Sequence, residues 1–326
     1  MKSEFIKSFR CPKCESEKLT IAEVAMPIVT GVVEFQLMCK QCNNAASMKN
    51  NIPRFVPESN YANSFGFQWN RHRQAQLDSY SGLPISRARV FSVTQWNEDL
   101  SGQRILEAGS GAGRFTEILL QTGALVYSFD YSEAVEANFA NNGQSPNLVL
   151  FQGDIFHIPL PPASFDKVFC LGVLQHTPEP ERAFMSLAKM VRPGGELVID
   201  VYANTLAAWL QWCYILRPIT RRMDKDRLYR VISNWAPRLI PVARFLRTIA
   251  GRAGARLMPI AEYSHLGLSP ELNREWVILD TFDIYSPAHD HPQSIAAVQR
   301  WFQTAGFTEI SVCRGPNGVV GKGRKS

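Results

Sequence analysis

The sequence predicts an α/β fold with a mostly parallel sheet covered by helices on both faces. From residue 104 onward, short apolar strands alternate with helical stretches, which is the pattern of strand–helix–strand units. A glycine-rich segment follows the first of these strands, and two CxxC pairs precede the α/β region. The 326 residues and 45% hydrophobic content suit a globular protein of about two domains and exclude collagen or a single coiled coil.

The N-terminal 57 residues contain four cysteines with the spacing C-x2-C-x24-C-x2-C. A gap of two residues lets a tight turn direct both thiolates of a pair at one ion, which predicts a closed, structural zinc site. Strands expected at 19–24 and 32–38 would complete a zinc ribbon. A disulfide framework or redox pairs are the alternatives, disfavoured by the cytoplasmic context and the missing βαβ pattern. The predicted zinc ligands are Cys11, Cys14, Cys39 and Cys42.

The ribbon is expected to end at residues 51–57, NIPRFVP. Because proline disfavours helix in the residue before it, we interpret this segment as an extended linker. Strands of the α/β region are then predicted at 104–108, 125–129, 148–152, 167–171, 196–202, 307–313 and 318–323. The helices between them are expected at 114–121, from Ser132, at 179–190 and at 294–304, with a turn at 192–195.

The loop after the first α/β strand reads E-A-G-S-G-A-G from Glu107 to Gly113. Glycines let the backbone turn sharply and approach a ligand, and the next helix offers its N-terminal N–H groups to an anion. The spacing differs from the G-x-G-x-x-G of dinucleotide sites, and the lysine of a P-loop is absent. In such sheets, ligands bind at the carboxyl ends of the strands.

This loop and several later segments resemble class I S-adenosylmethionine-dependent methyltransferases. The resemblance implies a Rossmann-like, seven-stranded methyltransferase sheet over about residues 100–202 and 294–323. Residues 61–96 and 280–287 are similar to bacterial members that carry an N-terminal zinc ribbon. The matching core segments are Glu107–Gly113, Asp130 after the second strand, Gly153-Asp154-Ile155 after the third, Leu171–His176 after the fourth and Arg192–Gly195 before the fifth.

The resemblance implies that S-adenosylmethionine is the cofactor, with Asp130 at the ribose hydroxyls and Asp154 at the adenine amino group. A glycine loop without lysine and with acidic neighbours suits a ligand that has an ammonium and a sulfonium but no phosphate. The alternative for Asp130 and Ser132 is that they only cap the next helix. The predicted cofactor-binding residues are Glu107, Gly109, Ser110, Gly111, Gly113, Asp130, Tyr131, Asp154, Ile155 and Gly172.

His176 lies where the family brings the acceptor and the methyl group together. Displacement at a sulfonium depends mainly on positioning in a water-poor pocket, and a base is needed only for a poorly ionised acceptor. His176 is our candidate for that base, with a structural role in the loop as the alternative. Weaker candidates near strand ends or in the late loop are Asp200, Tyr202, His265, Asp283 and Tyr285, and His289 and His291 lack a third metal ligand.

The acceptor is expected to be a small molecule, methylated at O, N or C and in some cases sugar- or lipid-linked. The sequence after strand four lacks the [DNS]-P-P-[FY] motif of nucleobase amino methylation, and Cys170 lacks the setting of a nucleophile. The alternatives are an RNA or tRNA methyltransferase that holds RNA with its zinc ribbon and basic insertion, and a non-catalytic cofactor-binding scaffold.

A helical insertion is predicted after strand five, at residues 203–262. Apolar residues recur at helical spacing in two stretches, which we expect to pack as a lid over the strand ends. Residues 203–261 contain 11 Lys and Arg against two Asp, whereas the whole chain has a net charge of +6. This basic insertion is expected to contact an anionic lipid surface or a lipid-linked substrate, with RNA as the alternative. The two apolar stretches are Trp209, Trp212, Ile215 and Leu216, and Leu239, Val242, Phe245, Leu246 and Ile249.

The expected organisation is a zinc ribbon and linker at 1–57, a helical segment over the cofactor site at 58–103, and the methyltransferase domain at 104–326. The N-terminal residues lack the apolar core of a secretory signal, and the apolar run 206–216 is shorter than the roughly 20 residues of a membrane span. We therefore expect a cytoplasmic protein that is peripheral to the membrane.

Overall fold

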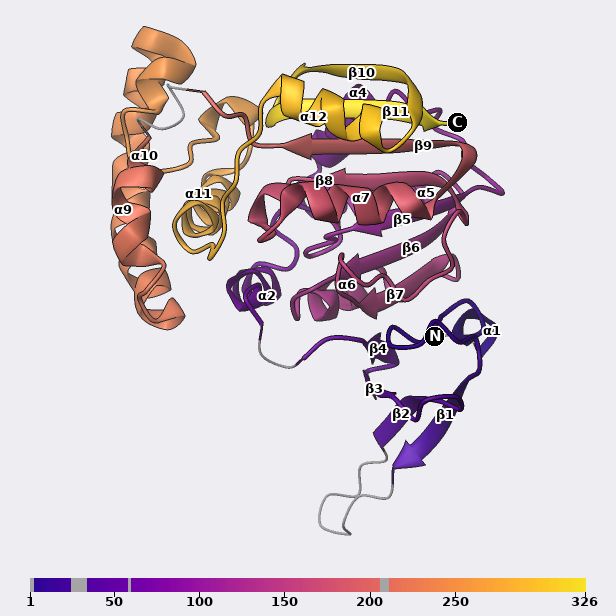
Figure 1. The fold of residues 1–326 in the computed structure, drawn as a ribbon. Helices are drawn as coiled ribbons and strands as arrows, with labels where there is room; N and C mark the ends of the chain where they lie inside the picture. Colours follow the sequence, from indigo (N-terminus) through magenta and orange to yellow (C-terminus); the bar gives the residue numbers. More distant parts are fainter. Residues whose placement is uncertain (1–2, 25–33, 58–59, 206–210) are drawn as a thin grey trace.

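A computed structural model describes residues 3–24, 34–57, 60–205 and 211–326. Its described strands form one continuous sheet in the order β1-β2-β3-β4-β7-β6-β5-β8-β9-β11-β10 (Figure 1). A layer of helices lies beyond one end of the strands, and the zinc-ribbon segment extends the sheet at the opposite side from the C-terminal hairpin. None of the described helices is long and apolar enough to span a membrane.

The seven strands predicted for the α/β region are all present, which confirms the Rossmann-like sheet. Five run parallel and the last two form an antiparallel hairpin beside β9. Their bounds are β5 (Arg104–Ala108), β6 (Leu125–Asp130), β7 (Leu148–Gln152), β8 (Phe165–Leu171), β9 (Val191–Val201), β10 (Phe307–Gly315) and β11 (Gly318–Lys325). The fifth strand begins at Val191 rather than at residue 196, so it includes the residues expected to form a turn. Its pairing with β8 has a register shift in this part.

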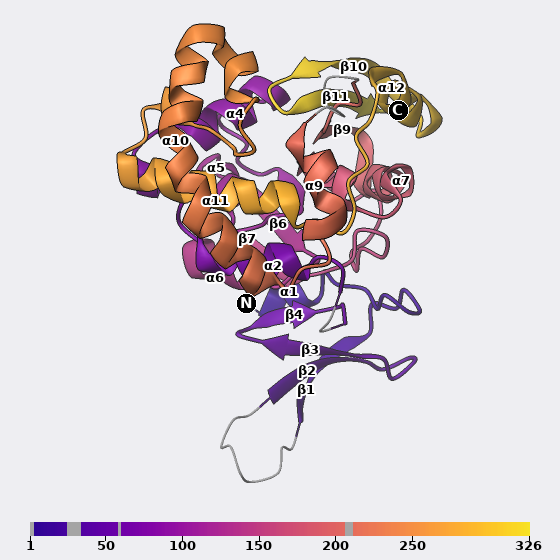
Figure 2. The same ribbon diagram turned by 90° about the vertical axis from the view of Figure 1, so that its left-hand side faces the viewer.

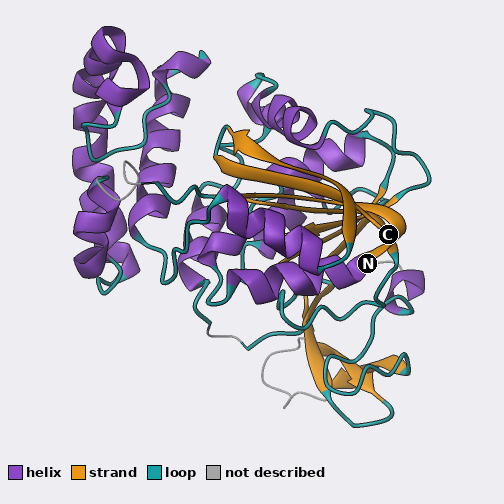
Figure 3. Cartoon of the chain, turned by 45° about the horizontal axis from the view of Figure 1, so that its top comes forward, coloured by secondary structure: helices purple, strands orange, loops and turns teal. Residues whose placement is uncertain are grey.

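Helices cover both faces of this sheet, as predicted (Figure 3). On one face, α7 (Pro180–Met190) and α12 (Ile295–Thr304) pack on alternate strand residues such as Leu106 and Phe129. On the other face, α4 (Ile85–Thr94), α5 (Arg114–Gln121) and α6 (Val135–Asn142) cover the intervening residues. Successive strand residues point to opposite faces, so a sheet covered twice needs apolar residues at nearly every position.

The N-terminal module contains α1 (Ser3–Ile6) and four strands, β1 (Leu19–Val24), β2 (Glu34–Cys39), β3 (Ala45–Lys49) and β4 (Ile52–Arg54). Successive strands pair antiparallel, and β4 then pairs in parallel with β7. The predicted linker at 51–57 is therefore wrong in part, because Ile52–Arg54 is a strand that joins the ribbon to the core sheet. The extended backbone that Pro53 favours is also the backbone of a strand.

Side chains from both modules pack across the β4–β7 junction. The fully buried Phe9 ring lies edge-on to Phe151, with 5.3 Å between the ring centroids. The guanidinium of Arg54 donates to Oε1 of Gln152 at 2.8 Å and forms an ion pair with Glu136. The zinc-ribbon module is thus packed on the third strand of the α/β core rather than tethered beside it.

The segment between the ribbon and β5 forms α2 (Asn63–Arg71), α3 (Asp78–Ser81) and α4. After β9, the insertion is helical as predicted, with α9 (Trp212–Thr220) and α10 (Lys225–Ala255). A further helix, α11 (Pro270–Tyr285), occupies the region expected to be a late loop. In Figures 1 and 2, α11 lies between the sheet edge and the outer helices α9 and α10. The remaining short helices are η1 (Leu174–His176) and η2 (Ser264–Leu266).

The apolar stripe predicted to hold α10 on the domain lies largely on its outer side. Val242, Phe245 and Ile249 are exposed, and the helix instead packs on α11 through Leu228, Ile232 and other small or aliphatic residues. In the first predicted stretch, Trp212 and Ile215 are exposed, and Trp209 lies outside the described residues. The lid therefore has apolar residues on both its inner and its outer face.

Candidate active site

A cavity of about 830 Å³ lies at the carboxyl ends of the parallel strands. The glycine loop and the ends of β6 to β8 form its floor, and α2 and α4 contribute one wall. The lid helices α9, α10 and α11 and the turn between β10 and β11 contribute the opposite side. A volume of this size accommodates a cofactor together with a second small molecule.

Most of the predicted cofactor residues line this cavity, and three do not. Gly113 begins α5 behind the loop, Glu107 is buried beneath it, and Asp154 caps the turn after β7 by accepting the Phe156 N–H at 2.9 Å. The lining residues from the predicted set are Gly109, Ser110, Gly111, Asp130, Tyr131, Ile155 and Gly172, and the candidate base His176 also lines the cavity.

The glycine loop has a backbone that only glycine adopts without strain. Gly109 has a φ of 78°, and a Cβ there would lie 2.2 Å from Cγ2 of Val173. A Cβ on Gly113 would lie 2.2 Å from Oδ1 of Asn138. The N–H groups of Gly109 and Ser110 both donate to the Phe129 carbonyl oxygen, at 2.8 and 3.0 Å, which fixes the loop to the end of β6.

Asp130 at the end of β6 connects two loops of the site. Its Oδ2 accepts the Gly111 N–H at 2.9 Å, and its Oδ1 accepts the N–H and hydroxyl of Ser132 at 2.8 and 2.7 Å. Burial raises the pKa of this carboxyl, while these donors act in the opposite direction. The helix cap considered for Asp130 and Ser132 is not present, because α6 has no side-chain capping bond; the two residues instead bond within the turn before it. The Asp130 carboxylate also lines the cavity.

Glu107 lies behind the glycine loop and is almost fully buried. Its Oε2 accepts hydrogen bonds from the hydroxyls of Thr116 and Ser128. Its Oε1 has no hydrogen-bond partner within the described part of the chain. Burial raises the pKa of Glu107 to about 7, although both hydroxyls lower it. The loop thus lies over a carboxyl group that changes charge near neutral pH.

His176 belongs to a cluster of rings on the lid side of the cavity. Its ring centroid lies 5.2 Å from that of Phe65 and 5.3 Å from that of Tyr202. Nδ1 of His176 lies 3.1 Å from the carbonyl oxygen of His289, a distance at which an Nδ1–H donates to that oxygen. In the neutral ring this leaves Nε2 without a proton and able to accept one.

Two half-buried arginines of the site were not found from the sequence. Arg89 on α4 forms an ion pair with Asp200 at 2.7 Å, and Asn317 donates to the other oxygen of Asp200 at 3.3 Å. A Cβ on Gly172 would lie 4.0 Å from the Arg89 guanidinium, so this cation borders the cofactor edge. Arg114 donates to Gln76, and burial lowers its pKa to about 10. Arg114 directly follows the glycine loop, but no sequence signal points to Arg89.

The weaker candidates divide into cavity residues and structural residues. Tyr202, His265 and Asp283 line the cavity, and Asp283 accepts a hydrogen bond from Gln68 at 2.8 Å. Tyr285 and Asp200 are not part of the lining, and the Tyr285 hydroxyl donates to the Pro259 carbonyl at 2.9 Å. Asp283 and Tyr285 both belong to α11 rather than to the expected loop.

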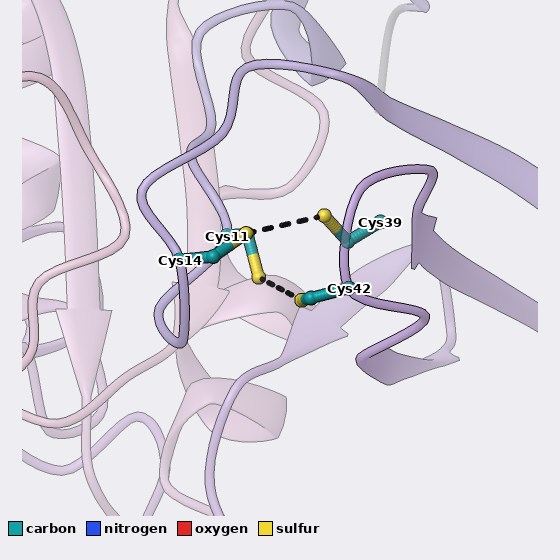
Figure 4. Close-up of side chains that lie close together, drawn as sticks. All are labelled: Cys11, Cys14, Cys39 and Cys42. Carbon is teal, nitrogen blue, oxygen red and sulfur yellow. Dashed lines mark hydrogen bonds between the residues drawn. The ribbon is translucent and has the colours of Figure 1, made fainter.

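Among the described residues, the four predicted zinc ligands are the one cluster of metal-ligating side chains. Their Sγ atoms all lie within 4.8 Å of one another, with 3.6 Å between Cys11 and Cys42 and between Cys14 and Cys39 (Figure 4). A tetrahedral ion with zinc–sulfur bonds of about 2.3 Å places its ligands about 3.8 Å apart. The arrangement therefore fits a closed tetrahedral site.

Comparison with known proteins indicates which protein family this chain resembles. Residues 106–199 match the family model described as a methyltransferase domain. The ubiquinone biosynthesis O-methyltransferase of Pectobacterium carotovorum is 26% identical over 145 residues, which cover 42% of this chain and 60% of that protein. The chain thus spans between about half and 60% of the length of several such relatives. Residues 106–199 are thus a methyltransferase domain, and the relatives support a class I S-adenosylmethionine-dependent methyltransferase.

Two further similarities extend over more of the chain. The tRNA U34 carboxymethyltransferase of Idiomarina loihiensis is 24% identical over 243 residues, covering 69% of this chain and 71% of that protein. The crystal structure of magnesium protoporphyrin IX methyltransferase from Synechocystis PCC 6803 with bound SAH aligns with a TM-score of 0.42 at 18% identity, covering 82% and 97% of the two chains. The relatives thus include small-molecule and tRNA methyltransferases.

The buried Glu107 predicts a specific pH dependence of stability. The folded protein holds the Glu107 proton from about pH 4.5 to about pH 7, whereas the unfolded chain has released it, so this carboxyl stabilises the fold less as the pH rises through that window. In Glu107→Gln this loss is absent, so the free energy of unfolding of the variant relative to wild type should rise with pH, by on the order of 3 kcal/mol.

Urea unfolding at several pH values between about 5 and about 8 measures this difference. Glu181→Gln, which alters an exposed glutamate on α7, serves as the matched control and should follow the wild-type profile. Parallel pH profiles for wild type and Glu107→Gln would contradict the assignment of a raised pKa to this residue.

Proposed function

We propose that the chain transfers the methyl group of S-adenosylmethionine to an O, N or C atom of a small-molecule acceptor. One observation supports this most directly: a single cavity connects the glycine loop with the ring cluster of Phe65, His176 and Tyr202 under the lid. In-line displacement at a sulfonium needs the acceptor held against the methyl group, away from water. A pocket beside the cofactor loop, covered in part by the lid helices, suits both needs.

The residues present fit this cofactor in charge and in shape. Gly109 and Gly111 line the cavity with a left-handed backbone, and Asp130 offers carboxylate oxygens to ribose hydroxyls. Arg89, beside Gly172, is suited to the cofactor carboxylate. Ile155 lines the cavity and is suited to the adenine, while Asp154, outside the lining, holds the turn beside it. The Glu107 carboxylate beneath the loop would attract the ammonium group. When bound, the cofactor supplies an electrophilic methyl group.

His176 is proposed as the general base for acceptors that must lose a proton. Nδ1–H donation to the His289 carbonyl would orient the ring and keep Nε2 as the accepting atom. The alternative role, holding the loop after β8, uses the same hydrogen bond. The surrounding rings favour an acceptor with a flat or apolar portion, since such a ligand packs against aromatic side chains.

RNA is the second candidate acceptor, and a non-catalytic scaffold is the third. The tRNA relative, the zinc ribbon and the basic insertion favour RNA. The covering of the cavity by α9 and α11 favours a small molecule instead, because a nucleotide within an RNA chain must also place its neighbours. For the insertion we propose an anionic lipid surface or a lipid-linked acceptor as partner, in a cytoplasmic protein that is peripheral to the membrane.

Zinc is proposed as a structural ion of the four cysteines. Closed coordination by four thiolates leaves no open position for a substrate, and the small ribbon gains folding free energy from the metal.

Elemental analysis of the purified chain tests the zinc proposal. We expect about one zinc ion per chain in wild type and loss of the ion in Cys14→Ser, with a lower melting temperature. Cys313→Ser, which changes an exposed cysteine outside the cluster, should keep the ion. A metal-free wild type whose mass shows two disulfides would contradict the proposal.

Incubation with S-adenosylmethionine labelled in its methyl group tests the proposed function. The full chain is supplied with a small-molecule extract and, in parallel, with RNA, and label is followed in each pool. We expect label in the small-molecule pool, and none with Gly109→Ala, whose Cβ would clash with Val173 in the left-handed loop.

The other outcomes decide between the remaining candidates. Label in RNA alone would contradict the small-molecule proposal and favour the tRNA-like alternative. Cofactor binding without label in either pool would favour the scaffold. Circular dichroism of Gly109→Ala checks that the control variant is folded.

A further inference from the structure

The lid carries a concentration of exposed apolar side chains on its outer side. On α9, Trp212, Ile215 and Ile219 recur at intervals of three and four residues. Val242, Phe245 and Ile249 do the same on α10, so each set occupies one face of its helix. The opposite faces pack on α11 through residues such as Cys213, Leu228 and Ala243. We define the outer lid face as Trp212, Ile215, Ile219, Val231, Val242, Phe245, Ile249 and Leu257, which are between 42 and 67% exposed.

Arginines surround this apolar face. The two inward arginines of the lid are paired, Arg217 with Asp290 and Arg247 with Glu262. Residues 203–261 contain only two acidic residues, Asp224 and Asp226, both at the start of α10. The exposed arginines are Arg221, Arg222, Arg227, Arg230, Arg238, Arg244, Arg252 and Arg256.

The same helix also borders the mouth of the active-site cavity. The backbone of α10 is broken at Ala250 and Gly251, where φ and ψ leave the helical region. Beyond this break, Arg252 and Arg256 line the cavity while remaining exposed. Among the described residues, neither arginine has a carboxylate within ion-pair distance. The outer lid face and the cavity opening therefore lie on neighbouring parts of one helix.

We propose that the outer lid face docks on the surface of an anionic lipid bilayer, with the cavity mouth beside the headgroups. The apolar side chains enter the boundary between headgroups and acyl chains, and the arginines contact lipid phosphates. The acceptor reaches the cavity from the bilayer past Arg252 and Arg256. This route of the acceptor rests on the proposed function, whereas the docking itself does not.

The apolar residues favour a bilayer over RNA. Arginines alone would suit phosphates of either partner. Phe245, Ile249 and Ile219 gain from leaving water only if the partner offers an apolar phase, which a bilayer supplies and an RNA backbone does not. In Figure 2, α9 and α10 lie side by side in front of α11, so one flat surface can meet both helices.

Vesicle flotation with the full chain tests the docking. The vesicles are phosphatidylcholine alone or phosphatidylcholine mixed with phosphatidylglycerol, at low and at physiological salt. We expect binding to the anionic vesicles at least about tenfold stronger than to the neutral ones. Phe245→Ser with Ile249→Ser should weaken anionic-vesicle binding about tenfold or more, and so should Arg238→Glu with Arg244→Glu.

Matched substitutions elsewhere separate docking from general effects. Ile21→Ser in the zinc ribbon and Arg300→Glu on α12 change exposed residues of the same types and should leave vesicle binding unchanged. Melting temperature and cofactor affinity of both lid variants should match wild type, because these residues line neither the core nor the cavity.

Three results would overturn the proposal. These are no binding to anionic vesicles at low salt, binding that survives both lid variants, and binding that depends on the arginines alone and is displaced by tRNA. A chain that binds vesicles as expected but methylates nothing would contradict the proposed function and leave the docking supported.

Discussion

The parallel pairing of β5 with both β6 and β8 is the constraint on which the site depends. Parallel neighbours place their carboxyl ends at one edge, and each loop that leaves that edge contributes to the same cavity. The glycine loop, Asp130 and Gly172 come from three successive positions along this edge. Sites at a sheet edge inherit the rigidity of the strands, so the backbone of the loop is fixed before a ligand arrives.

The zinc ribbon reaches this edge through its last strand. Arg54 of β4 contacts Gln152 of β7, and Nε2 of Gln152 donates to the Tyr131 carbonyl oxygen at 3.0 Å. Asn60 donates to the same carbonyl, also at 3.0 Å. Tyr131 follows Asp130 directly, so the support for one end of the cofactor edge includes residues of the ribbon and of the segment after it. A structural metal in the ribbon would thereby stabilise the methyltransferase site as well.

The strands and the glycine loop were predictable because their signals are local. Runs of apolar residues bounded by turns mark buried strands, and G-x-G-x-G restricts the loop to one kind of backbone. The strand at Ile52–Arg54 was missed because Pro53 suggested a linker, and only its pairing with β3 and β7 defines it. Helix α11 was missed because Trp276 to Leu279 are buried in succession, which removes the helical period.

The ion pair of Arg89 could not be predicted from sequence patterns. Arg89 is separated from Asp200 by more than 100 residues, and their pairing arises only when α4 packs against the sheet. The amphipathic pattern of α10 predicted a helix but not which face meets the domain, because both faces carry apolar residues. Tertiary packing on α11 decides that choice, and it leaves Val242, Phe245 and Ile249 outside.

Calorimetric titration with S-adenosylhomocysteine tests most directly whether the cofactor lies along the carboxyl edge with its carboxylate at Arg89. Arg89→Gln keeps a donor for Asp200 but removes the charge, and we predict binding roughly tenfold to a hundredfold weaker than wild type. Arg87→Gln, two residues away on α4 and outside the cavity lining, should bind as wild type does. Equal affinities for wild type and a folded Arg89→Gln would contradict this placement of the cofactor.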